Sequence, residues 1–157
     1  MHHYQVTIQW TGNTGSGTSH YQQYERSHTI QTEGKPIIEG SSDPAFRGDA
    51  AKYNPEELLL SALSSCHMLW FLHLCSTEKI VVVDYIDQAK GEMIEHSDGS
   101  GQFTKATLHP TVTVKHPVLE EKINHLHHLA HQKCFIANSV NFPVKQVAKL
   151  IIASASS

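Results

Sequence analysis

The chain has 157 residues, of which 39% are hydrophobic, and its formal net charge is -3. This length and apolar content suit one folded domain, which we expect to cover the whole range 1–157. Nucleic-acid-binding proteins usually carry a clear basic excess, so the charge argues against that class. The first residues, Met-His-His-Tyr, are not an apolar leader, and we expect a cytoplasmic protein with reduced thiols.

Three short strands are predicted before the first helix. Residues 4–10 alternate apolar and polar side chains, which indicates a half-buried strand. Residues 20–32 alternate more weakly and predict a second strand, and residues 37–38 fit a short third one. Residues 40–52 are rich in Gly, Pro and Asp, which favours a loop.

A helix is predicted over 54–76. Asn54 can cap it, and Pro55 has no amide hydrogen to lose at the first helical position. Glu56 and Glu57 place negative charge at the positive end of the helix dipole.

Apolar residues cover nearly every face of this predicted helix. Serines and histidines interrupt the apolar run, which indicates a central buried helix and no membrane partner. A helix of this kind in so short a chain needs cover on more than one side. A second copy of the chain could supply that cover, so we expect an obligate homodimer.

A long hairpin is predicted after the helix. Residues 79–93 begin with a β-branched run and then alternate, which predicts one long strand. An Asp-Gly pair within 96–102 marks the loop, and residues 103–114 form the return strand.

Two helices and a strand are predicted to end the fold. Residues 117–132 have amphipathic spacing, residues 134–140 fit a further short helix, and residues 144–147 fit a strand. Strands, a buried helix, a hairpin and further helices in this order are typical of an α+β fold.

The cysteines are the candidate nucleophiles. Their odd number in a reducing compartment argues against a structural disulfide framework. Cys66 lies in the middle of the predicted buried helix, whereas Cys134 is expected at the start of the short helix beside Lys133. A helix N-terminus and neighbouring cations would lower the pKa of that thiol. From the residues alone, either cysteine fits an inert core position equally well. Cys75 should face the opposite side of the helix from Cys66, as a structural thiol.

The histidines offer an alternative chemistry. Residues 125–131 contain histidine pairs at i,i+3 and i,i+4 spacing, which can bind zinc or nickel. No carboxylate is suitably placed in that stretch, so we favour a solvated helix face with one residue near the active site, and no bound metal. A metal-binding protein stays an alternative. His67, directly after Cys66, either lines a pocket or packs in the core.

Three segments together resemble the OsmC/Ohr family of organic hydroperoxide reductases. They are Asn-Pro-Glu-Glu-Leu at 54–58, Ala-Leu-Ser-Ser-Cys at 62–66 and Ala-His-Gln-Lys-Cys at 130–134. Their order and spacing fit the family over nearly the whole chain. The resemblance implies an intertwined α+β homodimer in which a central buried helix packs against antiparallel sheets. His67 and Phe135 depart from the residues that usually follow the two cysteines, which indicates a distinct subgroup.

The resemblance also implies an enzyme, a stress-response thiol peroxidase. Cys66 resembles the peroxidatic cysteine, which attacks an organic hydroperoxide and becomes a sulfenic acid, and Cys134 resembles the resolving cysteine. Glu56 resembles the active-site glutamate. The activating arginine would be Arg26, with Arg47 as the rival. No bound cofactor is implied, and a lipoyl-type dithiol from outside would reduce the disulfide again.

The spacing of Glu56 and Cys66 argues for a site shared between chains. Ten helical residues rise about 15 Å, which is too far for both residues to serve one site on a straight helix. We therefore expect Glu56 and Arg26 to complete the site of the partner chain.

Apolar neighbours of Cys66 favour an alkyl or fatty-acid hydroperoxide over hydrogen peroxide. The expected pocket residues are Leu63, His67, Trp70 and Phe71. The alternative to a peroxidase is a redox-sensing or ligand-binding protein of the same fold without efficient turnover.

Overall fold

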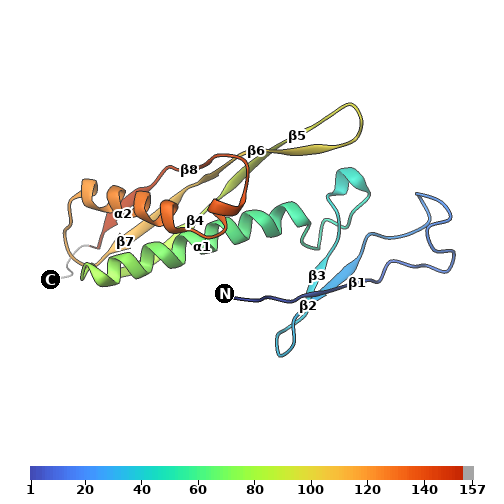
Figure 1. Cartoon of the computed structure of the whole chain (residues 1–157), viewed down its shortest axis with the longest axis horizontal. Coiled ribbons are helices and arrows are strands. Elements are labelled where there is room, and N and C mark those ends of the chain that lie inside the picture. Colours follow the sequence, from blue (N-terminus) through green and yellow to red (C-terminus); the bar gives the residue numbers. More distant parts are fainter. Residues whose placement is uncertain (154–157) are drawn as a thin grey trace. The chain divides into compact units, whose positions relative to one another are not determined.

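The computed structural model describes residues 1–153, and it divides into two compact units, Met1–Leu59 and a second that starts at Leu60. Figure 1 labels the elements of both. Each unit is described by itself. Runs of strands separated by helices form an α+β fold, which confirms the predicted class. The single domain over 1–157 stays a prediction.

The first unit contains a small antiparallel sheet. Strand β1 (Thr7–Trp10) pairs with β2 (His28–Gln31), which pairs with β3 (Ile38–Gly40). The strand predicted over 20–32 is therefore wrong in its first half. Residues there form turns instead, held by a hydrogen bond from the Gln23 amide to the His20 carbonyl (3.0 Å). All of β1 is exposed in the single chain, so the expected half-burial is not found.

Helix α1 (Pro55–Thr77) begins where the sequence predicts. The Asn54 side chain accepts a hydrogen bond from the Glu57 amide (2.8 Å), and the Glu57 carboxylate accepts one from the Asn54 amide (3.0 Å). This reciprocal pair is a capping box, which satisfies backbone donors that the first turn would leave unpaired. Beyond the last turn, Lys79 adopts a left-handed φ of 59° and turns the chain toward strand β4 (Val82–Asp87).

One stripe of α1 is buried. Its members, spaced four residues apart, are Leu63, His67, Phe71 and Cys75. Other apolar positions are open, and Leu69 is 63% exposed. The expectation of a helix buried on nearly every side is therefore not met within one chain. By length and composition alone α1 could cross a membrane, a test that core helices of soluble proteins also pass.

Two three-stranded sheets replace the single long hairpin predicted for the second unit. In each sheet one strand pair is antiparallel and the other is parallel. One sheet has the order β4-β7-β9, and the other has the order β5-β6-β8. The strands are β4 (Val82–Asp87), β5 (Lys90–Glu95), β6 (Gly101–Leu108), β7 (Pro110–Val114), β8 (Val144–Gln146) and β9 (Lys149–Ile152).

Asp87 explains the break in the predicted hairpin. Its carboxylate accepts hydrogen bonds from the His109 amide (2.6 Å) and from the Ser64 hydroxyl of α1 (2.5 Å). The His109 amide is thus withdrawn from strand pairing, and Pro110 has no amide hydrogen to contribute. The chain therefore changes sheets at Gln88–Ala89 and again at His109.

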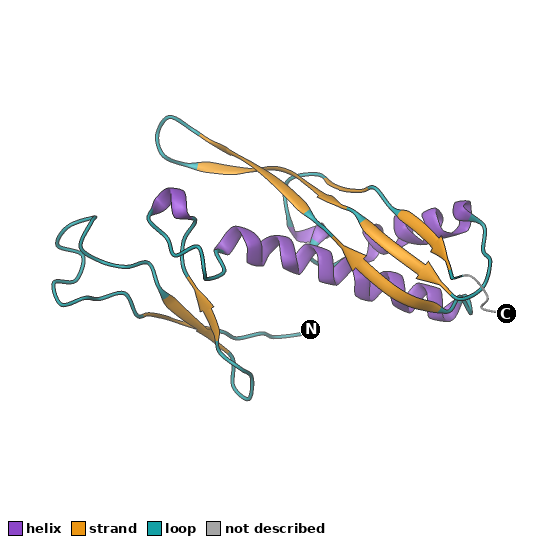
Figure 2. Cartoon of the chain, turned by 180° about the vertical axis from the view of Figure 1, so that it is seen from behind, coloured by secondary structure: helices purple, strands orange, loops and turns teal. Residues whose placement is uncertain are grey.

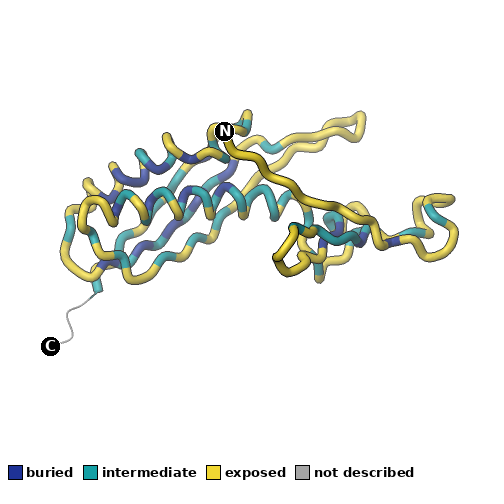
Figure 3. Tube along the Cα trace, turned by 60° about the horizontal axis from the view of Figure 1, so that its bottom comes forward, coloured by how far each residue is buried: buried dark blue, intermediate teal, exposed yellow. Residues whose placement is uncertain are grey.

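Helix α2 (Glu120–Lys133) covers the larger core. Its buried residues Ile123, Leu126 and Ala130 pack with Phe71 of α1 and with strand β7. Figure 2 shows the strands of this unit on one side and both helices on the other. In Figure 3 the buried positions gather between these layers, whereas the β5–β6 hairpin tip is exposed. A short 3-10 turn, Ala137–Ser139, follows α2 in place of the predicted helix over 134–140.

Candidate functional site

The two cysteines that the sequence singled out meet in the second unit. Cys66 is partly exposed in the middle of α1, and Cys134 is 1% exposed at the end of α2. Their thiols are within hydrogen-bonding reach of each other. Both are free thiols. Cys66 and Cys134 are 68 positions apart in the sequence (134 minus 66). The packing of α1 on α2 brings them together.

The electrostatic environment of Cys134 corrects one prediction. Cys134 is the C-terminal cap of α2 rather than the start of a helix. Burial raises the pKa of its thiol to about 11, and the adjacent Cys66 acts in the same direction. The Ala137 amide donates to the sulfur (3.4 Å) and opposes this shift. The lowered pKa predicted for Cys134 is therefore wrong, because desolvation outweighs the nearby donor.

Cys75 lies in the core, as predicted for a structural thiol. It is 1% exposed and packs with Phe71 and Val112. Burial raises the pKa of this thiol to about 11. A neutral, enclosed thiol of this kind is poorly suited to nucleophilic chemistry.

Glu56 and the two arginines belong to the first unit. The Glu56 Oε2 atom is buried and has no hydrogen-bond partner among residues 1–153. Arg26 and Arg47 line one cavity of about 300 Å³. Neither forms an ion pair within that described range. The prediction that Glu56 and an arginine lie beside a Cys66 thiol is not tested by these contacts and stays a prediction.

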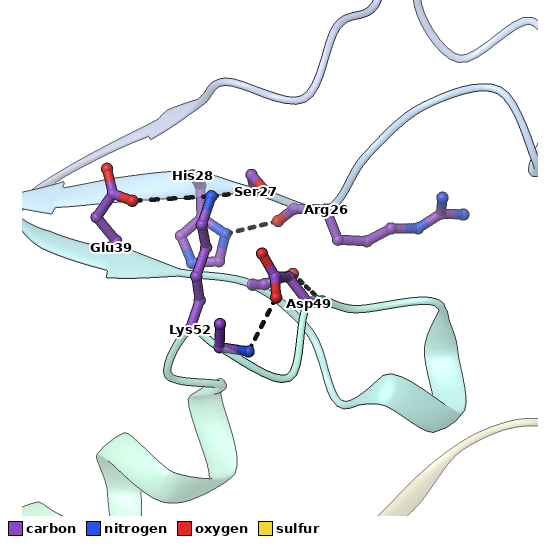
Figure 4. Close-up of polar contacts among 8 residues, drawn as sticks. Arg26, Ser27, His28, Glu39, Asp49 and Lys52 are labelled. Atoms are coloured by element: carbon purple, nitrogen blue, oxygen red, sulfur yellow. Dashed lines mark hydrogen bonds and ion pairs between the residues drawn. The ribbon is translucent and has the colours of Figure 1, made fainter.

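The Arg26 side chain is held by local aromatic residues. Its guanidinium carbon lies 3.8 Å from the ring centroid of Tyr24 and 4.4 Å from that of Tyr21. It also donates hydrogen bonds to the carbonyls of both tyrosines. In Figure 4 it extends away from the neighbouring polar cluster of the first unit. Stacking on aromatic rings restrains an arginine without neutralising its charge.

That polar cluster ties the segment before α1 to the sheet. Lys52 Nζ donates to the Ser27 hydroxyl (3.0 Å) and pairs with the Glu39 carboxylate (3.8 Å). The Ser41 hydroxyl accepts from the Asp49 amide (3.0 Å). These contacts order the backbone between β3 and α1, which leads into the first turn of α1, where Glu56 lies.

A buried histidine pair lies beside the cysteines and was not predicted. His67 Nε2 and His127 Nδ1 are 3.0 Å apart, and the residues are 2% and 3% exposed. The His127 ring also stacks on Phe71, with centroids 3.9 Å apart. The predicted solvated face is found at His125 and His128, which are exposed, whereas His127 is buried and lies off that face.

Burial keeps both histidines neutral. Desolvation lowers the pKa of His67 to about 4, with Asp87 opposing the shift and His131 adding to it. Desolvation and the neighbouring His67 lower the pKa of His127 to about 3. Buried ring nitrogens without partners among the described residues are His67 Nδ1, His127 Nε2 and His131 Nδ1.

The described residues contain no group of three or more His, Cys, Asp or Glu side chains that could hold a metal ion. Of the predicted pocket residues, Leu63, His67 and Phe71 are core residues of the second unit. Trp70 is partly exposed, with Phe135 edge-on to it (5.7 Å between centroids). Whether these residues contact a substrate stays a prediction.

Comparison with known proteins identifies the fold. A family model described as OsmC-like protein matches residues 48–147. The chain belongs to the OsmC-like protein family. An OsmC-like protein of unknown function from Vibrio cholerae is 32% identical, with 94% of this chain and 99% of that chain covered and a TM-score of 0.85. The family resemblance seen in the sequence is thus confirmed.

More distant OsmC-like structures share the fold. An organic hydroperoxide resistance protein from Elizabethkingia anophelis is 18% identical, with 96% of this chain and 97% of that chain covered and a TM-score of 0.67. The organic hydroperoxide resistance protein OhrB of Bacillus subtilis is 19% identical, with 94% and 98% covered and a TM-score of 0.58. No protein with a curated description matches this OsmC-like chain.

Sequence reasoning missed His127 and Asp87 as partners of the cysteine-bearing helix. The signal for His127 was present, since it lies four residues after Ile123 and beside Leu126 on the apolar face of α2. A histidine on such a face is buried whatever the polarity of its sequence neighbours. For Asp87 the sequence carries no comparable signal, because its partners on α1 and before β7 are distant in the chain.

Proposed function

We propose that this OsmC-like protein is a thiol peroxidase that reduces organic hydroperoxides with Cys66 and Cys134. The observation that carries the proposal is the contact between these two free thiols, one partly exposed and one buried. The proteins from E. anophelis and B. subtilis that share the fold are organic hydroperoxide resistance proteins, which supports this substrate class.

The chemistry follows from the two thiols. The Cys66 thiolate attacks the outer peroxide oxygen, so a sulfur–oxygen bond forms, the O–O bond breaks and the alcohol leaves after protonation. Cys134 then attacks the sulfur of the Cys66 sulfenic acid. A disulfide forms, and the hydroxyl leaves as water with the proton of the Cys134 thiol. An external dithiol, of lipoyl type, supplies two electrons and two protons to restore both cysteines.

Exposure and protonation support this division of roles. A peroxide can reach Cys66, whereas Cys134 is enclosed. The raised pKa of Cys134 keeps that thiol protonated near neutral pH. A protonated, buried thiol does not compete for peroxide, but it is in place once Cys66 has been oxidised.

An arginine would stabilise the Cys66 thiolate, and we assign this role to Arg26, with Arg47 as the rival. The charge of arginine persists on burial, and its fork can serve both a thiolate and a carboxylate. Glu56 would hold that arginine. The buried, unpartnered Glu56 Oε2 supports a cation arriving from outside the described chain. We propose that Glu56 and Arg26 act in the site of a partner chain.

The homodimer is part of the same proposal. Both units expose apolar side chains when taken alone, including Val6 (60%), Ile8 (58%) and Leu69 (63%). Large apolar side chains that a single chain leaves this exposed support an interface with a second copy. A second copy would cover the open side of α1.

A turnover assay tests the peroxidase directly. Reduced protein is mixed with cumene hydroperoxide and dihydrolipoamide, and peroxide loss is followed for wild type, Cys66→Ser, Cys134→Ser and the control Cys75→Ser. We expect Cys66→Ser to abolish turnover, Cys134→Ser to lose dithiol-dependent turnover and Cys75→Ser to stay active. Turnover that survives Cys66→Ser would reject the proposal. A single oxidation without turnover in wild type would favour a redox sensor.

A further inference from the structure

A side-chain hydrogen bond joins the two helices that carry the cysteines. We call His67 and His127, with their 3.0 Å contact, the histidine bridge. The rings are nearly parallel, at 5° to each other. His67 directly follows Cys66 on α1. His127 lies two turns before Cys134, about 20° away around α2 at 100° per residue.

The bridge is not explained by stability alone. In two neutral imidazoles, one nitrogen of the contact donates and the other accepts. Either assignment leaves a buried N–H on one ring and a buried lone pair on the other, because the outer nitrogens of both rings have no partner among the described residues. Unpaired buried polar groups cost free energy, and an apolar pair of similar volume would avoid that cost.

Its environment makes the contact specific. The Phe71 ring stacks on His127 and restricts it to one plane. Asp87 of β4 and His131 of α2 are the charged or titratable groups that act on His67. A hydrogen bond restrained in this way fixes one relative position of the two helices. The apolar contacts around it are not directional and restrict that position less.

We propose that the histidine bridge is a positioning device for the disulfide step, holding α1 and α2 at the separation at which Cys134 reaches the sulfur of Cys66. His67 and His127 are then positioning residues, and this role replaces the pocket lining predicted for His67, because both residues are buried, at 2% and 3% exposed. The histidine-bridge proposal depends on the proposed peroxidase function only in that the function supplies a peroxide as the oxidant. Another oxidant can also close the disulfide, so the bridge can be tested without peroxide.

Paired amide substitutions test the bridge. His67→Gln can place a polar atom near the position of the His67 Nε2 atom, and His127→Asn can place one near the position of the His127 Nδ1 atom. These two are the matched variants. His67→Asn and His127→Gln are their mismatched controls. Each protein is reacted with one equivalent of cumene hydroperoxide. Dimedone trapping measures sulfenic acid formation, and loss of free thiol measures closure.

Closure is compared with each variant's own rate of sulfenic acid formation, so that an effect on the first step is separated from an effect on closure. Closure should slow by about tenfold or more in the mismatched variants, because small displacements of reacting groups cost that much, and should stay near wild type in the matched ones. The double variant His67→Leu/His127→Leu fills the core without the bond and should also close slowly. A wild-type rate of disulfide closure in folded mismatched or double Leu variants would overturn the proposal. A closure rate that falls in proportion to the loss of Tm across the variants would also overturn it, because it would show a general loss of stability.

A second arm separates this proposal from the peroxidase assignment. Diamide replaces the peroxide, and the Cys66–Cys134 disulfide is equilibrated against dithiothreitol. One possible result is that the wild-type protein does not react with cumene hydroperoxide, while the disulfide formed with diamide is still less stable in the mismatched variants than in wild type. That result would reject the peroxidase proposal and support the bridge proposal. Equal disulfide stability in all variants would reject the bridge.

Discussion

Burial drives four ionisable core residues of the second unit toward their neutral forms. The pKa values of Cys75 and Cys134 are raised, and those of His67 and His127 are lowered. Both directions have one cause, the loss of water around a charge. Cys66, partly exposed on the same helix as His67 and Cys75, is the accessible thiol of this region.

Acid should destabilise the protein through the histidine bridge. The unfolded chain binds a proton on each histidine near pH 6.5, whereas folded His67 does so only near pH 4 and folded His127 near pH 3. The unfolded state therefore binds more protons below pH 6.5, and the free energy of unfolding should fall as pH drops from 6.5 toward 4. For His67 alone the loss is roughly 3 kcal/mol.

Urea titrations at pH 7, 5.5 and 4.5 measure this loss. His67→Leu/His127→Leu should have a flatter pH profile, and His128→Gln, at an exposed position, should follow wild type. Asp87 and His131, which face the bridge, would still titrate in every variant. An unchanged slope in the double variant would contradict the prediction.

Alkylation should distinguish the thiols. Iodoacetamide at pH 8 should modify Cys66 at least about tenfold faster than Cys75 or Cys134, because the latter are enclosed and protonated. Mass spectrometry of peptides after timed quenching reads out each site. In urea all three should react alike. Comparable rates for Cys66 and Cys134 in the native protein would show that Cys134 is not enclosed.

At the scale of elements, one carboxylate joins a helix to a change of sheet. Asp87 ends β4, accepts from Ser64 of α1 and accepts from the backbone just before β7. The same carboxylate acts on His67. It therefore connects the strand break to the stripe of α1 that carries the histidine bridge.

Removing this carboxylate should be costly. Asp87→Ala leaves the His109 amide and the Ser64 hydroxyl without their acceptor, and we expect a loss of about 3 kcal/mol in the free energy of unfolding. Asp84→Ala, on an exposed side chain of the same strand, is the matched control and should change it little. Chemical denaturation measures both. Equal effects would mean that the two bonds do not stabilise the sheet break.

At the scale of the whole molecule, we propose that a second chain covers the open side of α1 and the exposed β1. A site built from two chains has a testable signature, because a mixed dimer of two different inactive variants regains one intact site. In such a mixed dimer, the Cys66→Ser chain contributes Glu56 and Arg26 to the intact site, and the Glu56→Ala chain contributes Cys66 to it.

Complementation should therefore restore activity. Equal amounts of Cys66→Ser and Glu56→Ala, unfolded and refolded together, should give roughly a quarter of wild-type peroxidase activity, since half of the dimers are mixed and each has one complete site. The variants refolded separately and then assayed together are the control. No recovery in verified mixed dimers would place Glu56 in the site of its own chain.

Features that depend on near neighbours in the chain were predictable from the sequence alone. Asn54 and Pro55 marked the start of α1 because capping is decided within one turn. The spacing of the segments around Cys66 and Cys134 identified the family, which the comparisons confirm. The α+β class followed from the order of the periodic segments.

Features that depend on packing between distant segments were not predictable from the sequence and became visible in the folded chain. The sheet change at His109 requires Asp87, and the burial of His127 requires α1. The raised pKa of Cys134 follows from enclosure by the folded chain rather than from its cationic sequence neighbours. Desolvation depends on what covers a group, and no periodicity in the sequence specifies which helix will cover which.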